Sequence, residues 1–339
     1  MSTLNVPHHY KTIQVLFTAP QNKKTKKAAI NAAHSGDTIM IKPGIYHESL
    51  QIIKKEHLYL LAHPGSVILD GENQANIGIE IDSHHIQIQG VQIINFIAGI
   101  VSIGNYNTFY QITCANHQQS GISFIGNHNQ LLHCHLMDNK SSAISFSGNH
   151  NIFKANRVQN CSRGVVALGP SCHNYFIKNL LTHIETYALG IVSNGSKHHI
   201  FYKNTIDDSK YGILVQNGSS QLVKNNISHC HACGILIGHN QATICQNTLK
   251  ANETGLDLYT DYSEITGNTI QSGHQTGINL NGSHNKISQN VVVHYNSIGI
   301  LMNGYHNLQS HNILQGNQIN LIENDLKEPL IDVPKDLED

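Results

Sequence analysis

Tryptophan is absent from this chain, arginine occurs only twice, and charged residues make up 13% of its 339 residues. With a formal net charge of −1, the chain lacks the basic excess that neutralises nucleic acid or an anionic membrane surface. No apolar run approaches the roughly 18 residues of a transmembrane helix. These absences predict a protein with neither a nucleic-acid nor a membrane partner.

Cysteine is also sparse. The seven cysteines are odd in number and irregularly spaced, which fits reduced thiols better than a disulfide framework. The first residues lack the apolar core of a secretory signal. We therefore expect a cytoplasmic protein, with export by a route that needs no signal as the alternative.

What the chain has is a repeat of about 22 residues, marked by a small residue, usually glycine, followed by an aliphatic one. The steps are Gly78-Ile79, Gly99-Ile100, Gly121-Ile122, Ala143-Ile144, Gly164-Val165, Gly190-Ile191, Gly212-Ile213, Gly234-Ile235, Gly255-Leu256, Gly277-Ile278 and Gly299-Ile300. The interval from Gly164 to Gly190 is longer, at 26 residues. A fixed period of this length indicates a solenoid, in which each coil buries its apolar side against its neighbours.

Within each repeat the apolar residues alternate with variable ones, as in Ile213 and Val215 or Leu256 and Leu258. A period of two predicts half-buried strands rather than helices. About half a repeat later an asparagine recurs at a predicted turn. These residues are Asn156, Asn179, Asn204, Asn225, Asn247, Asn268, Asn290 and Asn312. Stacked on successive coils, they predict an asparagine ladder that satisfies polar backbone groups at a buried corner.

These motifs resemble the repeats of the pectin-lyase-like superfamily, which includes pectate lyases, polygalacturonases, alginate epimerases and NosD-like proteins. The resemblance covers roughly residues 36–322 and implies an all-β fold: one right-handed parallel β-helix of about eleven coils. It also implies that a polysaccharide would lie along the outer face of the Gly–aliphatic strand and the turn before it.

The chain ends differ from the repeat. Residues 1–35 predict a strand at 12–17 and a helix at 23–34 that caps the first coil. Residues 323–339 carry seven acidic side chains against two lysines and predict an acidic tail. The expected organisation is therefore an N-terminal cap at 1–35, a β-helix at 36–322 and a tail at 323–339.

Carboxylates are rare in the coils, and most of those between 83 and 322 fall between 185 and 264. In the predicted fold they gather at one corner of successive coils. The candidate catalytic residues there are Glu185, Asp207, Asp208, Lys210, Glu253 and Asp257. The candidate substrate-binding residues are Arg163, His183, Tyr187, Tyr211, His229, His231 and Tyr259.

Three chemistries stay open for this corner. Carboxylates one coil apart, such as Asp208 and Glu185, suit a nucleophile and an acid, and those two coils apart, such as Asp208 and Glu253, suit an acid and base around a water. Alternatively, Lys210 or Arg163 takes a proton beside a uronate neutralised by calcium, which is lyase chemistry. No other cofactor and no protein-bound metal site is predicted. The densest clusters of soft ligands are His229-Cys230-His231 and His133-Cys134-His135, but alternate residues of a strand face opposite sides, so His133 and His135 could share an ion with each other and not with Cys134.

Against an enzyme, the chain lacks the signature motifs of polygalacturonases, pectin methylesterases and alginate epimerases, and its corner turns are short. An apolar strip including Val192, Leu214 and Leu236 is expected on the outer face of the Gly–aliphatic strand. The alternative function is thus a non-catalytic scaffold that binds a glycan or protein, or self-associates, along this strip.

Overall fold

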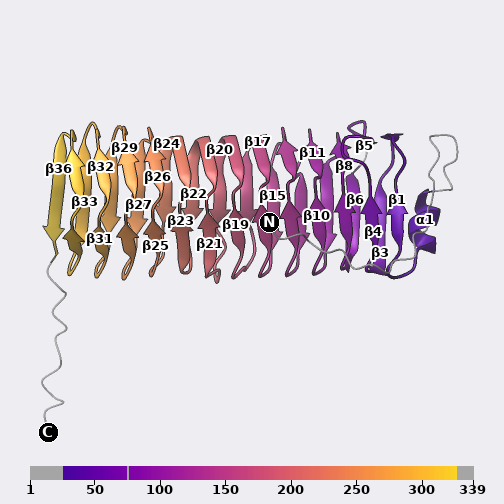
Figure 1. Ribbon diagram of the computed structural model, residues 1–339, viewed down its shortest axis with the longest axis horizontal. Coiled ribbons are helices and arrows are strands. Elements are labelled where there is room, and N and C mark those ends of the chain that lie inside the picture. The colour runs from indigo at the N-terminus through magenta and orange to yellow at the C-terminus, as the bar shows by residue number, and fades with distance from the viewer. Residues whose placement is uncertain (1–25, 75, 327–339) are drawn as a thin grey trace, which may run out of the picture.

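The computed structural model describes residues 26–74 and 76–326, which form one parallel solenoid of β-strands (Figure 1). One of its two sheets has thirteen strands, one from each coil. The expected eleven coils were two too few, because the rungs at 38–40 and 59–61 precede the first Gly–aliphatic step. At ~4.8 Å per rung, thirteen coils give a rod of roughly 60 Å.

The thirteen-stranded sheet, called sheet A, contains short strands whose central residue points into the core. Its strands are β1 (Thr38–Met40), β4 (Tyr59–Leu61), β7 (Gln87–Gln89), β10 (Thr108–Tyr110), β13 (Gln130–Leu132), β16 (Ile152–Lys154), β19 (Tyr175–Ile177), β21 (His199–Tyr202), β23 (Ser220–Val223), β25 (Thr243–Cys245), β28 (Glu264–Thr266), β31 (Lys286–Ser288) and β34 (Leu308–Ser310).

The other sheet, called sheet B, has 23 strands in two columns. The two columns meet at the corner of the coil that carries the predicted site. Before the corner lie β2 (Gly44–Tyr46), β5 (Val67–Asp70), β8 (Val91–Ile94), β11 (Thr113–Ala115), β14 (His135–Met137), β17 (Arg157–Cys161), β26 (Thr248–Lys250), β29 (Thr269–Gln271), β32 (Val291–Val293) and β35 (Ile313–Gln315). After it lie β3 (Leu50–Glu56), β6 (Ile77–His84), β9 (Ala98–Ile103), β12 (Ile122–Ile125), β15 (Ser142–Ser147), β18 (Arg163–Ala167), β27 (Thr254–Tyr259), β30 (Thr276–Asn281), β33 (Ile298–Gly304) and β36 (Ile319–Asp325).

Three central coils have no break at this corner. There the two strands join into β20 (Leu180–Ile191), β22 (Thr205–Val215) and β24 (Asn226–Ile237), each 11 or 12 residues long. Register irregularities occur between Ile184 and Tyr187 and between Ser209 and Tyr211, where the chain passes the corner as a bulge. These three strands carry most of the predicted site.

The predicted strand alternation and the asparagine ladder are confirmed. Inward residues such as Ile213 and Ile235 are fully buried and stack on the same position of the neighbouring coil. In the ladder, Asn225 Nδ2 donates to the Phe201 carbonyl and to Asn247 Oδ1, both at 2.9 Å. A hydrogen bond between buried groups contributes about 0.5–1.5 kcal/mol, and leaving such a group unpaired costs about 1–3 kcal/mol.

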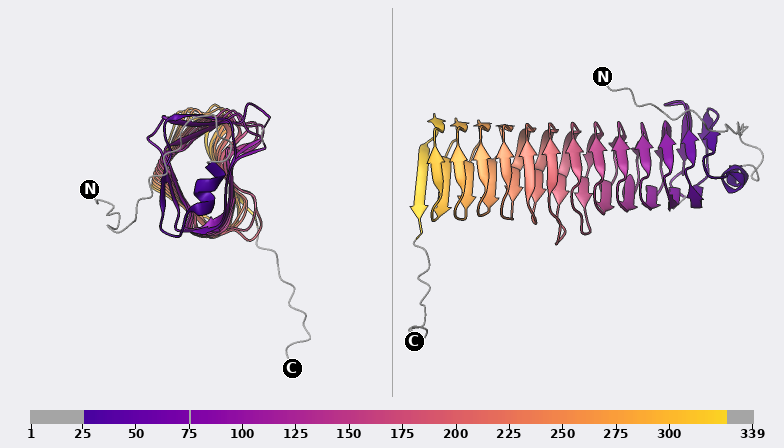
Figure 2. Two further views of the ribbon diagram at one scale, coloured as in Figure 1. Left: turned by 90° about the vertical axis from the view of Figure 1, so that its right-hand side faces the viewer. Right: turned by 60° about the horizontal axis from the view of Figure 1, so that its bottom comes forward.

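The only helix in the described residues, α1 (Lys26–Ala32), lies at the N-terminal end of the rod and is visible within the coil outline in Figure 2. Its Ile30 side chain is buried in the apolar core, a position that favours the expected role of the helix as an N-terminal cap. The strand expected at 12–17 and the tail beyond 326 lie outside the described residues. At the other end, β36 continues to Asp325, three residues past the expected end of the β-helix.

Candidate functional site

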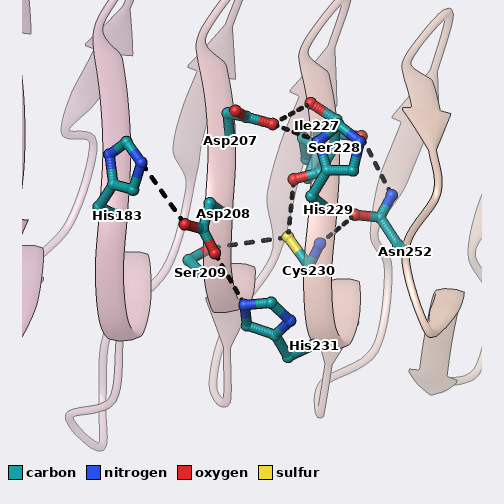
Figure 3. Close-up of polar contacts among 10 residues, drawn as sticks. All are labelled: His183, Asp207, Asp208, Ser209, Ile227, Ser228, His229, Cys230, His231 and Asn252. Carbon is teal, nitrogen blue, oxygen red and sulfur yellow. Dashed lines mark hydrogen bonds and ion pairs between the residues drawn. The ribbon is translucent and has the colours of Figure 1, made fainter.

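The predicted corner residues do lie along one flank of the rod. Ile184, Ser209 and Cys230 face one another on consecutive coils and point inward. Seven of the predicted ionisable residues lie within two positions of this buried column, namely His183, Glu185, Asp207, Asp208, Lys210, His229 and His231. We call the group His183, Asp207, Asp208, His229 and His231 the Asp–His ridge (Figure 3).

Asp208 is at the centre of the ridge, between two imidazoles. Its Oδ1 lies 2.7 Å from Nε2 of His231, and its Oδ2 lies 3.6 Å from Nε2 of His183. Asp208 has φ 56°, in the left-handed region, and so does His183, with φ 54°. This shared turn conformation places both side chains in one column. The contacts differ from the expected pairs of Asp208 with Glu185 or Glu253, because histidines occupy both carboxylate oxygens.

Asp207 points to the neighbouring coil instead. Its Oδ1 accepts hydrogen bonds from Ser228 Oγ and His229 Nδ1, both at 2.7 Å. Burial alone would raise the pKa of Asp207, but these two hydrogen bonds outweigh that effect and hold the pKa below its ordinary value. Asp207 is therefore ionised at neutral pH, and its charge fixes the orientation of the His229 ring.

The remaining candidates flank the ridge without joining it. Lys210 Nζ lies 5.7 Å from the ring centroid of Tyr211, and Arg163 donates to Ser141 Oγ at 2.9 Å. Glu185 is exposed and Glu253 half-buried, and neither has a described side-chain contact with the ridge aspartates. The structure therefore brings the histidines together with the aspartates but leaves the two glutamates apart from them.

Asp257 and Tyr259 form a separate polar pair further along the rod. Burial raises the pKa of Asp257, against the opposing effect of the 2.8 Å hydrogen bond from Asn279 Nδ2. The Asp257 charge in turn raises the pKa of Tyr259. The sequence reasoning missed two partners, Ser228 and Asn279. Each stands one repeat, 21 or 22 residues, after the aspartate that it contacts, so the repeat itself could have indicated them.

The expected apolar strip is largely covered by the chain itself. Val166 is fully buried and Leu214 is only 7% exposed. In register between them lies Gly190 rather than the predicted Val192. The Tyr187 ring covers Gly190 so closely that an added Cβ would lie 2.5 Å from its Cδ2. Leu236 and Val192 are half-buried. The strip is thus less exposed than expected, and only its half-buried members reach solvent.

The reason for this correction is a shift in register. Leu189 pairs with Val165 on one side and with Ile213 on the other, so the step on this rung is Ala188-Leu189 rather than Gly190-Ile191. Ala188 lies 24 residues after Gly164 and 24 before Gly212. Two coils are therefore two residues longer each, instead of one coil four residues longer.

The placement of the His, Cys, Asp and Glu side chains bears on whether calcium or a soft metal could bind. In residues 26–74 and 76–326, no group of three or more His, Cys, Asp or Glu side chains is placed to hold an ion. The Cys230 thiol points inward beside Ser209, and burial raises its pKa to about 12, so it stays protonated at neutral pH. The ridge as it stands does not fit a metal centre.

The described part of the chain likewise contains no helix with the length and hydropathy that crossing a membrane requires.

Two protein-family models match the chain. The model described as "Right handed beta helix region" matches residues 76–226, and the model described as "Periplasmic copper-binding protein (NosD)" matches residues 181–328. Each covers somewhat less than half of the chain, and together they span almost all the coils. The fold is a right-handed parallel β-helix, as the sequence resemblance predicted. A comparison with curated protein sequences found no match to this β-helix.

Solved structures show the same fold at low sequence identity. The alginate lyase AlyGC of family PL6 is 14% identical with a TM-score of 0.55, over 94% of this chain and 54% of its own. The A-module of the Azotobacter vinelandii mannuronan C-5 epimerase AlgE4 is 12% identical with a TM-score of 0.51, over 90% and 93%. A tailspike mutant of E. coli bacteriophage HK620 in complex with a hexasaccharide is 9% identical with a TM-score of 0.57, over 92% and 73%. This β-helix thus spans about half the length of the alginate lyase.

Proposed function

We propose that this β-helix binds a polysaccharide along the Asp–His ridge and that the Asp208–His231 pair exchanges a proton with it. The observation that carries the proposal is the 2.7 Å contact between Asp208 Oδ1 and His231 Nε2 on an imidazole whose side chain is 70% exposed. The other ring nitrogen, Nδ1, makes none of the described hydrogen bonds, and we assign it the contact with the polysaccharide.

A carboxylate bound to one nitrogen of a histidine fixes its tautomer and stabilises the imidazolium that forms when the other nitrogen takes a proton. Removal of the proton next to a uronate carboxyl group is the first step of both β-elimination and epimerisation. In this assignment His231 Nδ1 accepts that proton, while Asp208 holds the ring. Lyase or epimerase chemistry therefore has more support than glycoside hydrolysis, which needs two carboxyl groups free to act on one glycosidic bond.

The similar structures agree with a polysaccharide ligand. Their names describe an alginate lyase and a mannuronan C-5 epimerase, and the tailspike is in complex with a hexasaccharide. A parallel solenoid presents a linear polymer with equivalent positions at ~4.8 Å intervals. Tyr211 and the exposed Tyr259 on the same flank offer ring faces to sugars.

A non-catalytic glycan-binding scaffold is the second candidate, and one observation favours it. The side chains of His183, His229 and His231 are 59–70% exposed. An open site of this kind does not exclude water, whereas enzymes gain much of their electrostatic stabilisation by doing so. Binding without turnover would satisfy this candidate and contradict the catalytic one.

The test uses the full chain with alginate, polygalacturonate and a neutral glucan. We expect binding to a uronate polymer, with either unsaturated uronate products seen by ultraviolet absorbance or deuterium exchange at the uronate C5 seen by NMR. His231→Gln and Asp208→Asn should lower the rate at least 100-fold and leave circular dichroism unchanged. The matched control is His294→Gln, at the same corner outside the ridge. Absence of binding to every polymer would overturn the whole proposal.

The calcium requirement expected for a lyase is a separate prediction. The assay is repeated with added calcium and with a chelator. Equal rates would remove calcium from the proposal, and a rate that depends on calcium would require the polymer itself to supply ligands that the ridge lacks.

A further inference from the structure

Two ladders run side by side along the corner that enters sheet A, and both are interrupted on neighbouring rungs. Most corners have an outer residue that carries a ring and an inner residue, directly after it, that is usually asparagine. The pairs are Tyr106-Asn107, His128-Asn129, His150-Asn151, His173-Asn174, His198-His199, Ser219-Ser220, Gln241-Ala242, Tyr262-Ser263, His284-Asn285 and His306-Asn307.

The outer ladder is a stack of rings. From His57 to His198, seven rings follow one another with centroids 4.4–5.0 Å apart. Ser219 and Gln241 then interrupt the stack, which resumes with Tyr262 and His284, 4.8 Å apart and almost parallel. The gap leaves one face of the His198 ring without a stacked neighbour on the next two rungs.

The inner ladder fails at the same place. Up to Asn174, each inner asparagine accepts a hydrogen bond from the backbone N–H of the inner residue on the preceding coil, as in the 2.7 Å bond from Asn151 N to Asn174 Oδ1. The next inner residue is His199, which is fully buried and in register with Ser220. Neither ring nitrogen of His199 forms a well-aligned hydrogen bond within the protein, although the Ser171 backbone lies near the ring, and Ser220 Oγ forms none. Buried polar atoms without partners are rare and require an explanation.

A groove of about 310 Å³ opens where both ladders lapse. His173, His198, Ser219 and Gln241 line its outer side. The outward side chains of sheet A line the other, namely Tyr175 of β19, Ile200 of β21, Gln221 of β23 and Thr243 of β25, and His199 and Ser220 lie between the two sides. The volume is at the lower end of the roughly 300–1,000 Å³ of small-molecule sites.

We infer that this groove binds a single neutral pyranose residue, either as a free sugar or within a chain. No Lys, Arg, Asp or Glu lines it, so nothing there balances a charged ligand. Serine, threonine and glutamine side chains both donate and accept, as sugar hydroxyls do. The open face of His198 matches the apolar face of a pyranose, and the outward side chains of Gln221, Gln241 and Thr243 offer partners to its hydroxyl groups.

This site is independent of the Asp–His ridge, because it lies on sheet A and the ridge lies on sheet B. It is also poorly shaped for a metal ion. Stacked, nearly parallel imidazoles about 4.9 Å apart direct their nitrogens alongside one another rather than toward a common point, whereas zinc or copper needs nitrogens at ~2.0–2.1 Å.

The test is saturation-transfer NMR on the full chain with glucose, galactose, mannose, N-acetylglucosamine and their methyl glycosides at about 10 mM, which populates even a Kd near 1 mM. Ser219→His should continue the ring stack into the groove, and His199→Asn should restore the inner ladder. We expect at least one neutral sugar to bind the wild type and each variant to weaken it at least tenfold. Preference for the methyl glycoside would identify a residue within a chain, and preference for the reducing sugar a free one.

Two controls make the result specific. His128→Ser opens the ring stack elsewhere but keeps Asn129, and Asp208→Asn alters only the ridge, so both should bind sugar as the wild type does. The inference is overturned if no neutral sugar shows transfer, if Ser219→His binds as well as the wild type, or if galacturonate binds as tightly as its neutral counterpart.

Discussion

The asparagine ladder gives the sharpest prediction about stability, and Asn225 is the position to test. This residue is 1% exposed and lies in the middle of the rod. Its Oδ1 accepts from Asn204 N at 3.0 Å, and its Nδ2 donates to the Phe201 carbonyl at 2.9 Å. Asn225→Ala leaves that N–H and that carbonyl buried without partners. At about 1–3 kcal/mol each, the free energy of unfolding should fall by about 2–6 kcal/mol.

The assay is urea unfolding combined with hydrogen exchange of the Asn204 amide, because a solenoid can open locally before it unfolds as a whole. The matched control is Asn312→Ala at the last ladder rung. Asn312 makes the same kinds of bond, to Asn290 and the Ile287 carbonyl, but is half-buried, so water can replace it at a cost below about 1 kcal/mol. Equal losses at the two positions would refute the reasoning that burial sets the cost.

Two further predictions concern protonation and packing. Burial lowers the pKa of His117 to about 4 and of His199 to about 3, so below pH 6.5 the unfolded chain takes up protons that the folded chain refuses. Stability should therefore fall by about 1.4 kcal/mol per pH unit for each histidine between about pH 6 and 4.5, and urea midpoints of His117→Asn should show a shallower fall. Gly190→Ala places a methyl group against the Tyr187 ring and should lower the free energy of unfolding in urea by about 1–3 kcal/mol. The control Gly238→Ala has no contact closer than 3.4 Å and should leave this free energy nearly unchanged. Equal effects of the two substitutions would contradict this account.

Much of the fold could be predicted from the sequence because a repeat constrains every coil at once. Period-two alternation fixes which side chains are buried, and the recurrence of asparagine fixes a corner, so residues such as Ile213 and Asn225 could be placed without a structure. The first two coils lie within the predicted β-helix at 36–322 but were left out of the coil count for the same reason. Their strands at 38–40 and 59–61 bury Ile39 and Leu60 but lack the Gly–aliphatic step by which coils were counted.

The site was less predictable, because side-chain partners depend on register at single-residue precision. Taking Gly190-Ile191 as the Gly–aliphatic step shifted the predicted register of that strand by two residues, so Val192 was expected at the position that Gly190 occupies. The bulge after Ile184 causes this displacement, and no residue type in the segment indicates how a bulge divides the added length. The spacing between rungs suggested that Asp208 acts with Glu185 or Glu253. The left-handed turn shared by Asp208 and His183 instead directs it to imidazoles.

Both proposed sites originate in the same departure from the regular repeat. On most other coils an asparagine fills the corner and hydrogen-bonds the backbone of the neighbouring coil, as Asn151 and Asn225 do. In the two coils that are two residues longer, β20 passes the corner without a break and carries His183 beside Asp208. The same coil then reaches sheet A with His199 in place of the ladder asparagine. Local rules of a fold are most often broken where function requires it. If the added residues served only as a tolerated insertion, deleting two of them near Ser193 would leave sugar binding at the groove unchanged, and loss of that binding in a folded variant is the expected result.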